Sequence, residues 1–517
     1  MKTHPVTKRA LAIAASAGLL VLGACVDDNG GGASTNPTRD VAFVGYSNPD
    51  TRQTTCGNCH ISKQRTWQLT AHAGAWADLQ ASGFAEESCN RCHTTNGSSN
   101  LAPDTAGFLS VSADAKKFYY DVQCEACHGP GAQHITAPDE SQPLVTITAA
   151  VGLDIGCGTC HSGTHTPFVE EWSASAHGQF RTSVGTNAEF ATYCSNCHEG
   201  RKAARRFDPE ARFAEDNSST NQAITCAVCH DPHGGPNAGQ LRRPIDVPDI
   251  DVNLCMMCHQ RRSVPDPTSS RGPHSPQGPM LLGEAGWVPP NFAYDATRQA
   301  STHGSASNPR LCAGCHVEAF STTDAVTGDF IGVTGHRFLP IPCVDANGAP
   351  TGATDCLDTQ RRFAACTASG CHGNENAARS ARQILAGRLL AYQDVLWKDL
   401  DNDGVLDALP TDSGLLARVK LTSPCEFSTA TTAPTGACTG NPIGSTIVTV
   451  GEGVWFNADM IRRGDGSNGV HNPFYAEALL LGSTQALRAQ YTYLPPAPPA
   501  ERTLAAARDR VLRQARP

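Results

Sequence analysis

Pairs of cysteines followed at once by a histidine recur along the chain, at a spacing that suits covalent attachment of haem. Sixteen cysteines form eight Cys-x-x-Cys-His segments. Two thiols at this spacing can bond to the two vinyl groups of one porphyrin, while the adjacent imidazole binds the iron as proximal ligand. Zinc sites and redox dithiols also use Cys-x-x-Cys, but eight copies that each end in His favour haem c. The motifs are Cys56, Cys59 and His60; Cys89, Cys92 and His93; Cys124, Cys127 and His128; Cys157, Cys160 and His161; Cys194, Cys197 and His198; Cys226, Cys229 and His230; Cys255, Cys258 and His259; and Cys312, Cys315 and His316.

A ninth haem is predicted at Cys366, Cys371 and His372, where four residues rather than two separate the cysteines. A disulfide or a free thiol pair is the alternative reading of this segment. The remaining cysteines of the folded part are spaced for two short disulfide loops, although four cysteines allow three connectivities. They are Cys343, Cys356, Cys425 and Cys438.

Spare histidines match the predicted haems in number. Removing His4 and the nine proximal histidines from the total of 19 leaves nine. The matching counts favour two imidazoles on every iron, and the scarcity of methionine favours low-potential haems. His233 follows His230 by three residues, a reach of at most about 10 Å, so it must bind the iron of another haem. The predicted distal ligands are His72, His134, His165, His177, His233, His274, His303, His336 and His471.

An internal repeat of about a hundred residues organises these motifs. Trp67, Thr70 and His72 recur as Trp172, Ser175 and His177 at an offset of 105. We therefore predict three trihaem units at 51–150, 151–250 and 251–373, the last degraded by insertions, followed by a helical region at 374–517.

The expected fold is mostly α with extensive coil, wrapped around a stacked haem array. Hydrophobic residues make up 40% and aromatic residues 6% of the chain, so porphyrins must fill part of the interior. Short helical turns are predicted at 64–79 and 168–180, and longer helices at 374–400, 474–488 and 501–515. The insertions at 264–309 and 317–363 are rich in Pro, Gly, Ser and Thr, which is typical of loops.

An acidic segment after the first long helix could hold a calcium ion. Asp399, Asp401 and Asp403 alternate along the chain, Gly404 follows, and Asp407 comes three residues later. Alternating carboxylates around a Gly bend are typical of calcium loops. A solvated acidic turn is the alternative.

The N-terminus reads as an export and lipidation signal. Lys2, Lys8 and Arg9 precede an apolar stretch at 11–22, and Leu-Gly-Ala then leads to Cys25, as in a bacterial lipobox. We predict a signal peptide at 1–24, a lipid on Cys25, and an anchor and flexible tether at 25–50. A stray Cys after an ordinary secretory signal is the alternative. Acids outnumber bases 49 to 40, which disfavours nucleic-acid binding, and no internal apolar run of membrane-spanning length occurs.

Four segments carry a resemblance to a known family. They are Gln-Cys-Glu-Ala-Cys-His-Gly-Pro-Gly-Ala-Gln-His at 123–134, Cys-Ala-Val-Cys-His-Asp-Pro-His at 226–233, Pro-His-Ser-Pro-Gln-Gly at 273–278 and Gly-Val-His-Asn-Pro-Phe-Tyr at 469–475. The chain resembles the multihaem c-type cytochromes of metal-reducing bacteria, including outer-membrane lipoprotein, cytochrome c-554-like and octahaem reductase groups. The resemblance implies maturation outside the cytoplasm, stacked haem pairs, and a role for His471 as distal ligand of a distant haem. It departs from ammonia-forming nitrite reductases, because no Cys-x-x-Cys-Lys motif is present.

Three functions are compatible with these features. An electron carrier would pass charge between periplasmic or outer-membrane partner proteins and an external acceptor, with the protein on either face of the outer membrane or beyond it. A reductase or oxidase of a nitrogen or sulfur oxyanion would need one open iron, with His165 the most suspect ligand. A filament subunit would continue its haem chain across contacts between copies. We favour the carrier over a substrate-converting enzyme.

Overall fold

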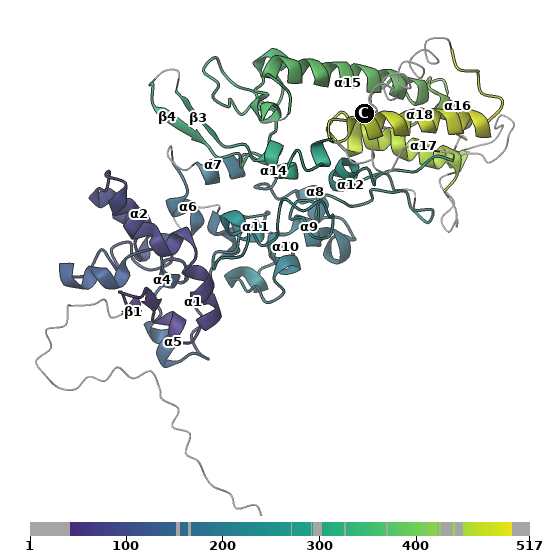
Figure 1. Cartoon of the computed structure of the whole chain (residues 1–517). Coiled ribbons are helices and arrows are strands. Elements are labelled where there is room, and N and C mark those ends of the chain that lie inside the picture. The colour runs from purple at the N-terminus through teal and green to yellow at the C-terminus, as the bar shows by residue number, and fades with distance from the viewer. Residues whose placement is uncertain are drawn as a thin grey trace, which may run out of the picture.

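The protein is an elongated array of short helices that ends in a helical bundle (Figure 1). The computed structural model describes residues 42–498, apart from 151–155, 164–166, 270, 291, 293–301, 325–326, 369–370, 408, 421–422, 425–437 and 440–447. The predicted fold class is confirmed: the structure is mostly helical, with little regular secondary structure in its N-terminal part. Cys25, the predicted tether up to residue 41, His165, Cys425 and the helix predicted at 501–515 lie outside the described residues. Residues 42–50, the end of the predicted tether, include β1 (Tyr46–Asn48) and the buried side chains of Phe43 and Tyr46.

Most helices of the N-terminal part have only one or two turns. Several coincide with attachment motifs, because one helical turn places residues three apart on the same side and so brings both thiols to one porphyrin edge. The α-helices are α1 Ile61–Trp67, α2 Ala75–Ala81, α3 Asn90–His93, α4 Cys124–His128, α5 Ala132–Thr136, α6 Cys157–Cys160, α7 Phe168–Ser173, α8 Thr182–Gly185, α9 Ser195–His198, α10 Gly200–Phe207, α11 Cys226–Cys229, α12 Gln277–Leu282 and α14 Leu311–His316.

The C-terminal bundle consists of α15 Glu375–Leu396, α16 Leu415–Val419, α17 Val450–Asp459 and α18 Pro473–Gln490. Its long helices begin at side-chain caps: the side-chain oxygen of Asn374 accepts a hydrogen bond from the Ala377 amide, and that of Asn472 accepts one from the Tyr475 amide. The helices predicted at 374–400 and 474–488 are therefore present with slightly different ends. α17 was not predicted, although Thr449 and Glu452 form a capping box at its start.

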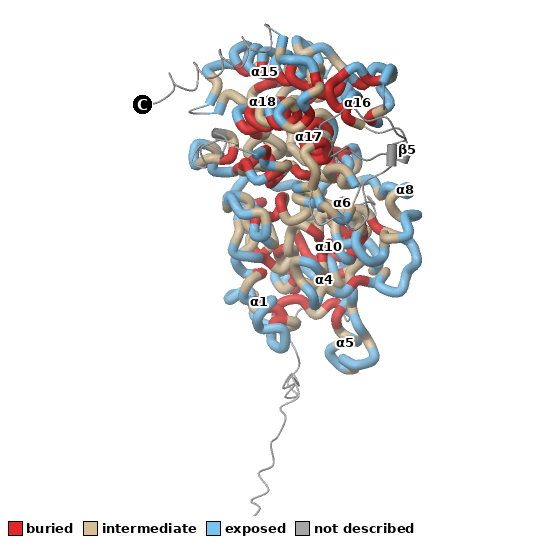
Figure 2. Tube along the Cα trace, turned by 90° about the vertical axis from the view of Figure 1, so that its right-hand side faces the viewer, coloured by how far each residue is buried: buried red, intermediate tan, exposed pale blue. Residues whose placement is uncertain are grey.

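Apolar packing is concentrated in this bundle. Its largest cluster joins side chains such as Leu389, Leu416, Phe456 and Leu479, all buried. The clusters of the N-terminal part are small, for example Phe43 with Phe108 and Tyr119. Figure 2 shows the same contrast, with buried residues densest around α15 to α18. A chain with such small cores needs another apolar component to stabilise it, and porphyrins bound at the attachment motifs would supply that component.

The insertions of the third unit are more ordered than predicted. The segment 264–309 contains α12, and 317–363 contains an antiparallel hairpin of β3 Phe320–Thr323 and β4 Phe330–Val333. These insertions therefore hold regular elements as well as the expected loops. β3 reads Phe-Ser-Thr-Thr and β4 reads Phe-Ile-Gly-Val, and aromatic and β-branched residues of this kind favour strands. The other strands are β1 Tyr46–Asn48 with β2 Gln53–Thr54, and β5 Ser423–Pro424 with β6 Cys438–Thr439.

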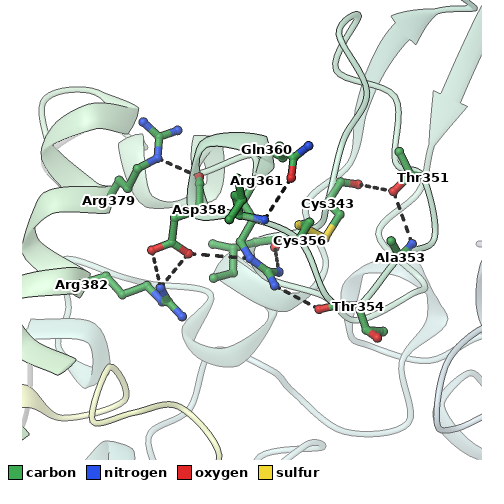
Figure 3. Close-up of a disulfide and its surroundings, with 12 residues drawn as sticks. Cys343, Thr351, Ala353, Thr354, Cys356, Asp358, Gln360, Arg361, Arg379 and Arg382 are labelled. Carbon is green, nitrogen blue, oxygen red and sulfur yellow. Dashed lines mark hydrogen bonds and ion pairs between the residues drawn. A yellow bond between two sulfur atoms is a disulfide. The ribbon is translucent and has the colours of Figure 1, made fainter. Parts of the chain in front are cut away.

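A disulfide joins Cys343 to Cys356 beside the start of α15 (Figure 3). Next to it, the carboxylate of Asp358 accepts two hydrogen bonds from Arg382 at 2.8 and 2.9 Å, and so ties the disulfide loop to the helix. None of the described helices is both long and apolar enough to cross a membrane.

Candidate haem sites

Imidazole rings lie in pairs, each joining the histidine of one attachment motif to a spare histidine from elsewhere in the chain. We number the attachment sites 1 to 9 in chain order, from His60 at site 1 to His372 at site 9. Eight sites have a described partner, and the ring centres of the pairs are 6.0–6.4 Å apart. The pairs are His60 with His134, His128 with His233, His161 with His72, His198 with His274, His230 with His336, His259 with His177, His316 with His471, and His372 with His303.

This spacing fits an iron between the rings. A metal–nitrogen bond of about 2 Å on each side, plus about 1.1 Å from each nitrogen to its ring centre, gives a separation of about 6.2 Å. The angle between the ring planes ranges from 19° for His60 and His134 to 74° for His177 and His259, while the distance hardly changes. Direct packing of two rings would make the distance depend on the angle, whereas two bonds to a common iron do not. The residues therefore fit haem with two axial imidazoles.

Backbone carbonyls orient many of these rings. In each case the Nδ1–H group donates a hydrogen bond to a carbonyl oxygen, so the Nε2 lone pair stays free for a metal. Such a bond fixes both the tautomer and the direction of the ring. The bonds are His93 to Ala75 at 3.0 Å, His128 to Pro143 at 2.5 Å, His134 to Ser141 at 2.6 Å, His230 to Gly239 at 2.6 Å, His303 to Val470 at 2.6 Å, and His316 to Phe338 at 2.9 Å.

Two distal rings contact a carboxylate instead. Nδ1 of His471 lies 2.6 Å from Oδ1 of Asp465, whose side chain is 1% exposed. Nδ1 of His233 lies 3.1 Å from Oδ1 of Asp231, which is 19% exposed and also pairs with Arg242. A carboxylate on the far nitrogen makes an imidazole a more electron-donating ligand, so these pairs favour ferric iron.

Burial keeps most of the spare imidazoles neutral. It lowers the pKa of His72 and of His177 to about 4, with smaller contributions from the neighbouring rings His161 and His259 respectively. A neutral imidazole is the form that binds a metal. At His471 the effect of burial, which alone would lower the pKa, is outweighed by Asp465, and the pKa is raised.

The repeat recurs as the same set of contacts in two places. Nε1–H of Trp67 donates to the Val122 carbonyl at 3.0 Å, and Nε1–H of Trp172 donates to the Ile224 carbonyl at 2.7 Å. The amides of Val122 and Ile224 in turn donate to the carbonyls of His72 and His177. Each Trp therefore joins two segments: the one that carries the spare histidine and the one that leads into the next attachment motif.

Glu171 positions another spare histidine. Its carboxylate accepts hydrogen bonds from the Thr334 amide, the Thr334 hydroxyl and the His336 amide, all at 2.8 Å. These bonds fix the turn after β4 to α7, and the turn presents His336 to His230. Sequence reasoning missed this role, because Glu171 lies 165 residues before His336.

Cysteine sulfurs of different sites meet, which reveals which sites are neighbours. Sites 1 and 3 meet through Cys56 and Cys124, sites 2 and 4 through Cys92 and Cys160, sites 4 and 6 through Cys157 and Cys226, sites 5 and 7 through Cys197 and Cys258, and sites 7 and 8 through Cys255 and Cys312. Weaker electrostatic coupling, without such contact, links sites 3 and 4 through Cys127 and Cys157, sites 6 and 7 through Cys229 and Cys255, and sites 8 and 9 through Cys315 and Cys371. Since each sulfur is bonded to a porphyrin edge once haem is attached, adjacent sulfurs bring two porphyrins together.

The acidic segment after α15 gathers three carboxylates. One oxygen of each of Asp399, Asp401 and Asp403 lies within 4.8 Å of the others. Asp407 is not part of this group, and its amide donates to Asp412. Arg462 lies 3.5 Å from Asp399 and competes with a cation for its charge. Calcium binding stays a prediction.

Parts of the chain are similar to known multihaem cytochromes. Residues 55–129 match the family described as cytochrome c554 and c-prime, and residues 219–263 match a doubled CXXCH motif. The multiheme cytochrome MtrA of Shewanella baltica is 26% identical over 198 residues, which cover 35% of this chain and 54% of MtrA. The polyheme cytochrome OmcB of Geobacter sulfurreducens is 24% identical over 304 residues, which cover 45% of this chain and 38% of OmcB. The chain thus spans about half or less of the length of these relatives.

Among solved structures, the outer cell wall cytochrome OcwA is similar over 77% of this chain and 75% of its own, with a TM-score of 0.45 and 16% identity. The segments that match the two families contain the motifs of sites 1, 2, 3, 6 and 7. The chain therefore binds several haem c groups through Cys-x-x-Cys-His motifs.

Proposed function

We propose that this multihaem c-type cytochrome carries electrons through nine haems, each held by two histidines, between redox partners of the cell envelope and an extracellular acceptor. The paired imidazoles carry the proposal, because eight pairs at 6.0–6.4 Å leave room for an iron and for no further ligand. His165, which lies outside the described residues, is the one spare histidine left, and we assign it to site 2 by elimination. Iron saturated by two imidazoles exchanges electrons but offers no position for a substrate.

The sulfur contacts, together with the weaker electrostatic couplings between sites 3 and 4, 6 and 7, and 8 and 9, support a branched order of sites. The main line runs 1, 3, 4, 6, 7, 8, 9, while site 2 joins at site 4 and site 5 joins at site 7. Each haem supplies the electron-accepting iron. The chain's own residues would hold neighbouring porphyrins close together, and backbone carbonyls fix the tautomers of many of the imidazoles.

The cell-envelope setting of the proposal depends on the N-terminus. A lipid on Cys25 would tether the array to a membrane through the segment 25–50. Reaction with partner proteins and calcium binding at Asp399, Asp401 and Asp403 belong to the same proposal. The negative net charge of the chain, −9, favours basic or cationic partners over most of its surface.

A break in the main line tests the proposal. We would attach the protein to an electrode through an N-terminal tag and measure the charge exchanged in fast voltammetry. Replacing Cys226 and Cys229 by Ser removes the haem of site 6, so only sites 1 to 4 should exchange electrons. The matched variant replaces Cys89 and Cys92 by Ser and so removes the side haem of site 2. The charge that it exchanges should fall by the amount carried by one haem. Equal losses in the two variants would contradict the proposed order.

A further inference from the structure

An excess of positive charge surrounds one haem site of this acidic protein. Nη1 of Arg206 lies 3.4 Å from Sγ of Cys197, and the guanidinium of Arg261 lies over the ring of Tyr193, the residue before Cys194 of site 5. Besides burial, the charge of Arg181 lowers the pKa of His198, and the charges of Arg262 and Arg261 lower the pKa of His274. Arg271 belongs to the same group, because its positive charge and that of Arg261 both lower the pKa of Arg262, in addition to the effect of burial. We call these five residues the arginine collar. It contrasts with a net charge of −9 for the whole chain.

The collar is only slightly neutralised by the protein. Arg271 pairs with Glu189 at 2.6 Å. Within the described part of the chain, no ion pair is found for the other four arginines. The charged side chains that change the pKa of His198, Cys197 and His274 most are not acidic. Burial and the repulsion of Arg271 and Arg261 lower the pKa of Arg262, which shows how closely the charges are gathered.

The collar is also accessible. Arg181, Arg206, Arg261 and Arg271 are exposed, as is the ring of Tyr193, which lies 5.7 Å below the guanidinium of Arg261. The five arginines come from four separate segments and gather around site 5 where it adjoins site 7, since the charge of Arg206 also acts to lower the pKa of Cys258 at site 7. A flat basic patch would instead spread its charges along one element. Convergent charge favours a compact anion.

Haem propionates do not account for the whole collar. Two propionates of one haem neutralise two of its charges. Nη1 of Arg206 lies 3.4 Å from Sγ of Cys197, at the edge where the porphyrin is bonded to cysteine. Vinyl-derived thioethers and propionates occupy opposite edges of a porphyrin, so this arginine is not placed for a propionate of its own site.

We propose that the arginine collar is the docking site for a small redox-active polyanion, which exchanges electrons with the haem of site 5. The inference rests on the proposed electron transfer through the haems. One electron leaves ferrous haem at site 5, which becomes ferric, and the bound acceptor is reduced by one electron. Site 7 then reduces site 5 again. A side branch suits this role, because a partner can dock there without interrupting the main line.

The test is the second-order rate at which an outer-sphere oxidant reacts with the fully reduced holoprotein in a stopped-flow instrument. Ferricyanide serves as the trianionic probe and hexaammineruthenium(III) as the tricationic one. At low ionic strength, Arg206→Gln with Arg261→Gln should slow ferricyanide about tenfold, because steering of this kind changes on-rates by about 10- to 1,000-fold. The slowing should vanish at high salt, and the rate with hexaammineruthenium(III) should not fall.

The matched control is Lys63→Gln with Arg65→Gln on α1, which removes the same charge from exposed positions near site 1. It should leave the ferricyanide rate within twofold of the wild type. Equal slowing in both double variants would overturn the inference, since net charge alone would explain it. So would an unchanged rate in the collar variant, because the arginines would then not steer an anion to site 5. If the double variant loses a haem, we would measure Arg261→Gln alone. We expect this single variant to react with ferricyanide about threefold more slowly than the wild type. An unchanged rate would contradict the inference. Failure of haem reduction, or of oxidation by both probes in the wild type, would instead refute the proposed function.

Discussion

The buried carboxylate beside His471 should set a low reduction potential at site 8. Replacing Asp465 by Asn removes one negative charge and keeps an oxygen close to Nδ1 of His471, which is 2.6 Å away in the native protein. Adding the width of the ring puts the lost charge about 6.5 Å from the iron. At an effective dielectric constant of about 20, the Coulomb energy is about 2.5 kcal/mol. For one electron this corresponds to a rise in potential of about 110 mV.

The shift can be measured by a redox titration followed by electron paramagnetic resonance, which resolves ferric haems individually. Asp231→Asn at His233 provides a graded comparison, because Asp231 is 19% exposed where Asp465 is 1% exposed. Water screens the more exposed charge, so its removal should raise the potential by less than half as much. A titration in which Asp465→Asn moves no haem upward, or moves it less than Asp231→Asn does, would refute the reasoning.

Three further predictions concern positioning, stability and cation binding. Glu171→Ala should release His336 and open the iron of site 6, so the reduced protein should gain CO binding that the wild type lacks; unchanged low-spin spectra would show that Glu171 is dispensable. Replacing Cys343 and Cys356 by Ser should lower the free energy of unfolding by about 3 kcal/mol, from loss of a short loop closure, and a denaturant titration with an unshifted midpoint would contradict this. Calcium at about 100 times its dissociation constant should stabilise the chelator-treated protein by about 2.7 kcal/mol, an effect that Asp403→Asn should abolish; equal melting temperatures with and without calcium would leave the acidic turn as a solvated loop.

Local patterns could be predicted from the sequence, and long-range partners could not. The attachment turns and the capped helices α15 and α18 depend on residues three or four apart. The pairing of His72 with His161, by contrast, joins rings 89 residues apart and is set by how successive units stack. A rule was nevertheless present in the repeat: the histidine that follows the repeated Trp, at His72 and His177, pairs with the first motif of the next unit, at His161 and His259.

The same rule places a different boundary in the third unit. His303, the counterpart of His72 and His177, pairs with His372 of site 9. By this criterion site 9 opens a fourth unit, and the third unit lacks its side haem. The sequence did not reveal this because insertions obscure the period there. Nor could it reveal the arginine collar, whose members lie up to 90 residues apart in the chain.

The central claim is that every haem iron carries two histidines. Electron paramagnetic resonance of the fully oxidised holoprotein, with spin quantitation against a haem count by mass spectrometry, tests it most directly. We predict nine haems per chain, all low-spin, with the nearly perpendicular pair His177 and His259 giving the most anisotropic signal. A high-spin signal that accounts for one or more haems, or a haem count well below nine, would contradict it.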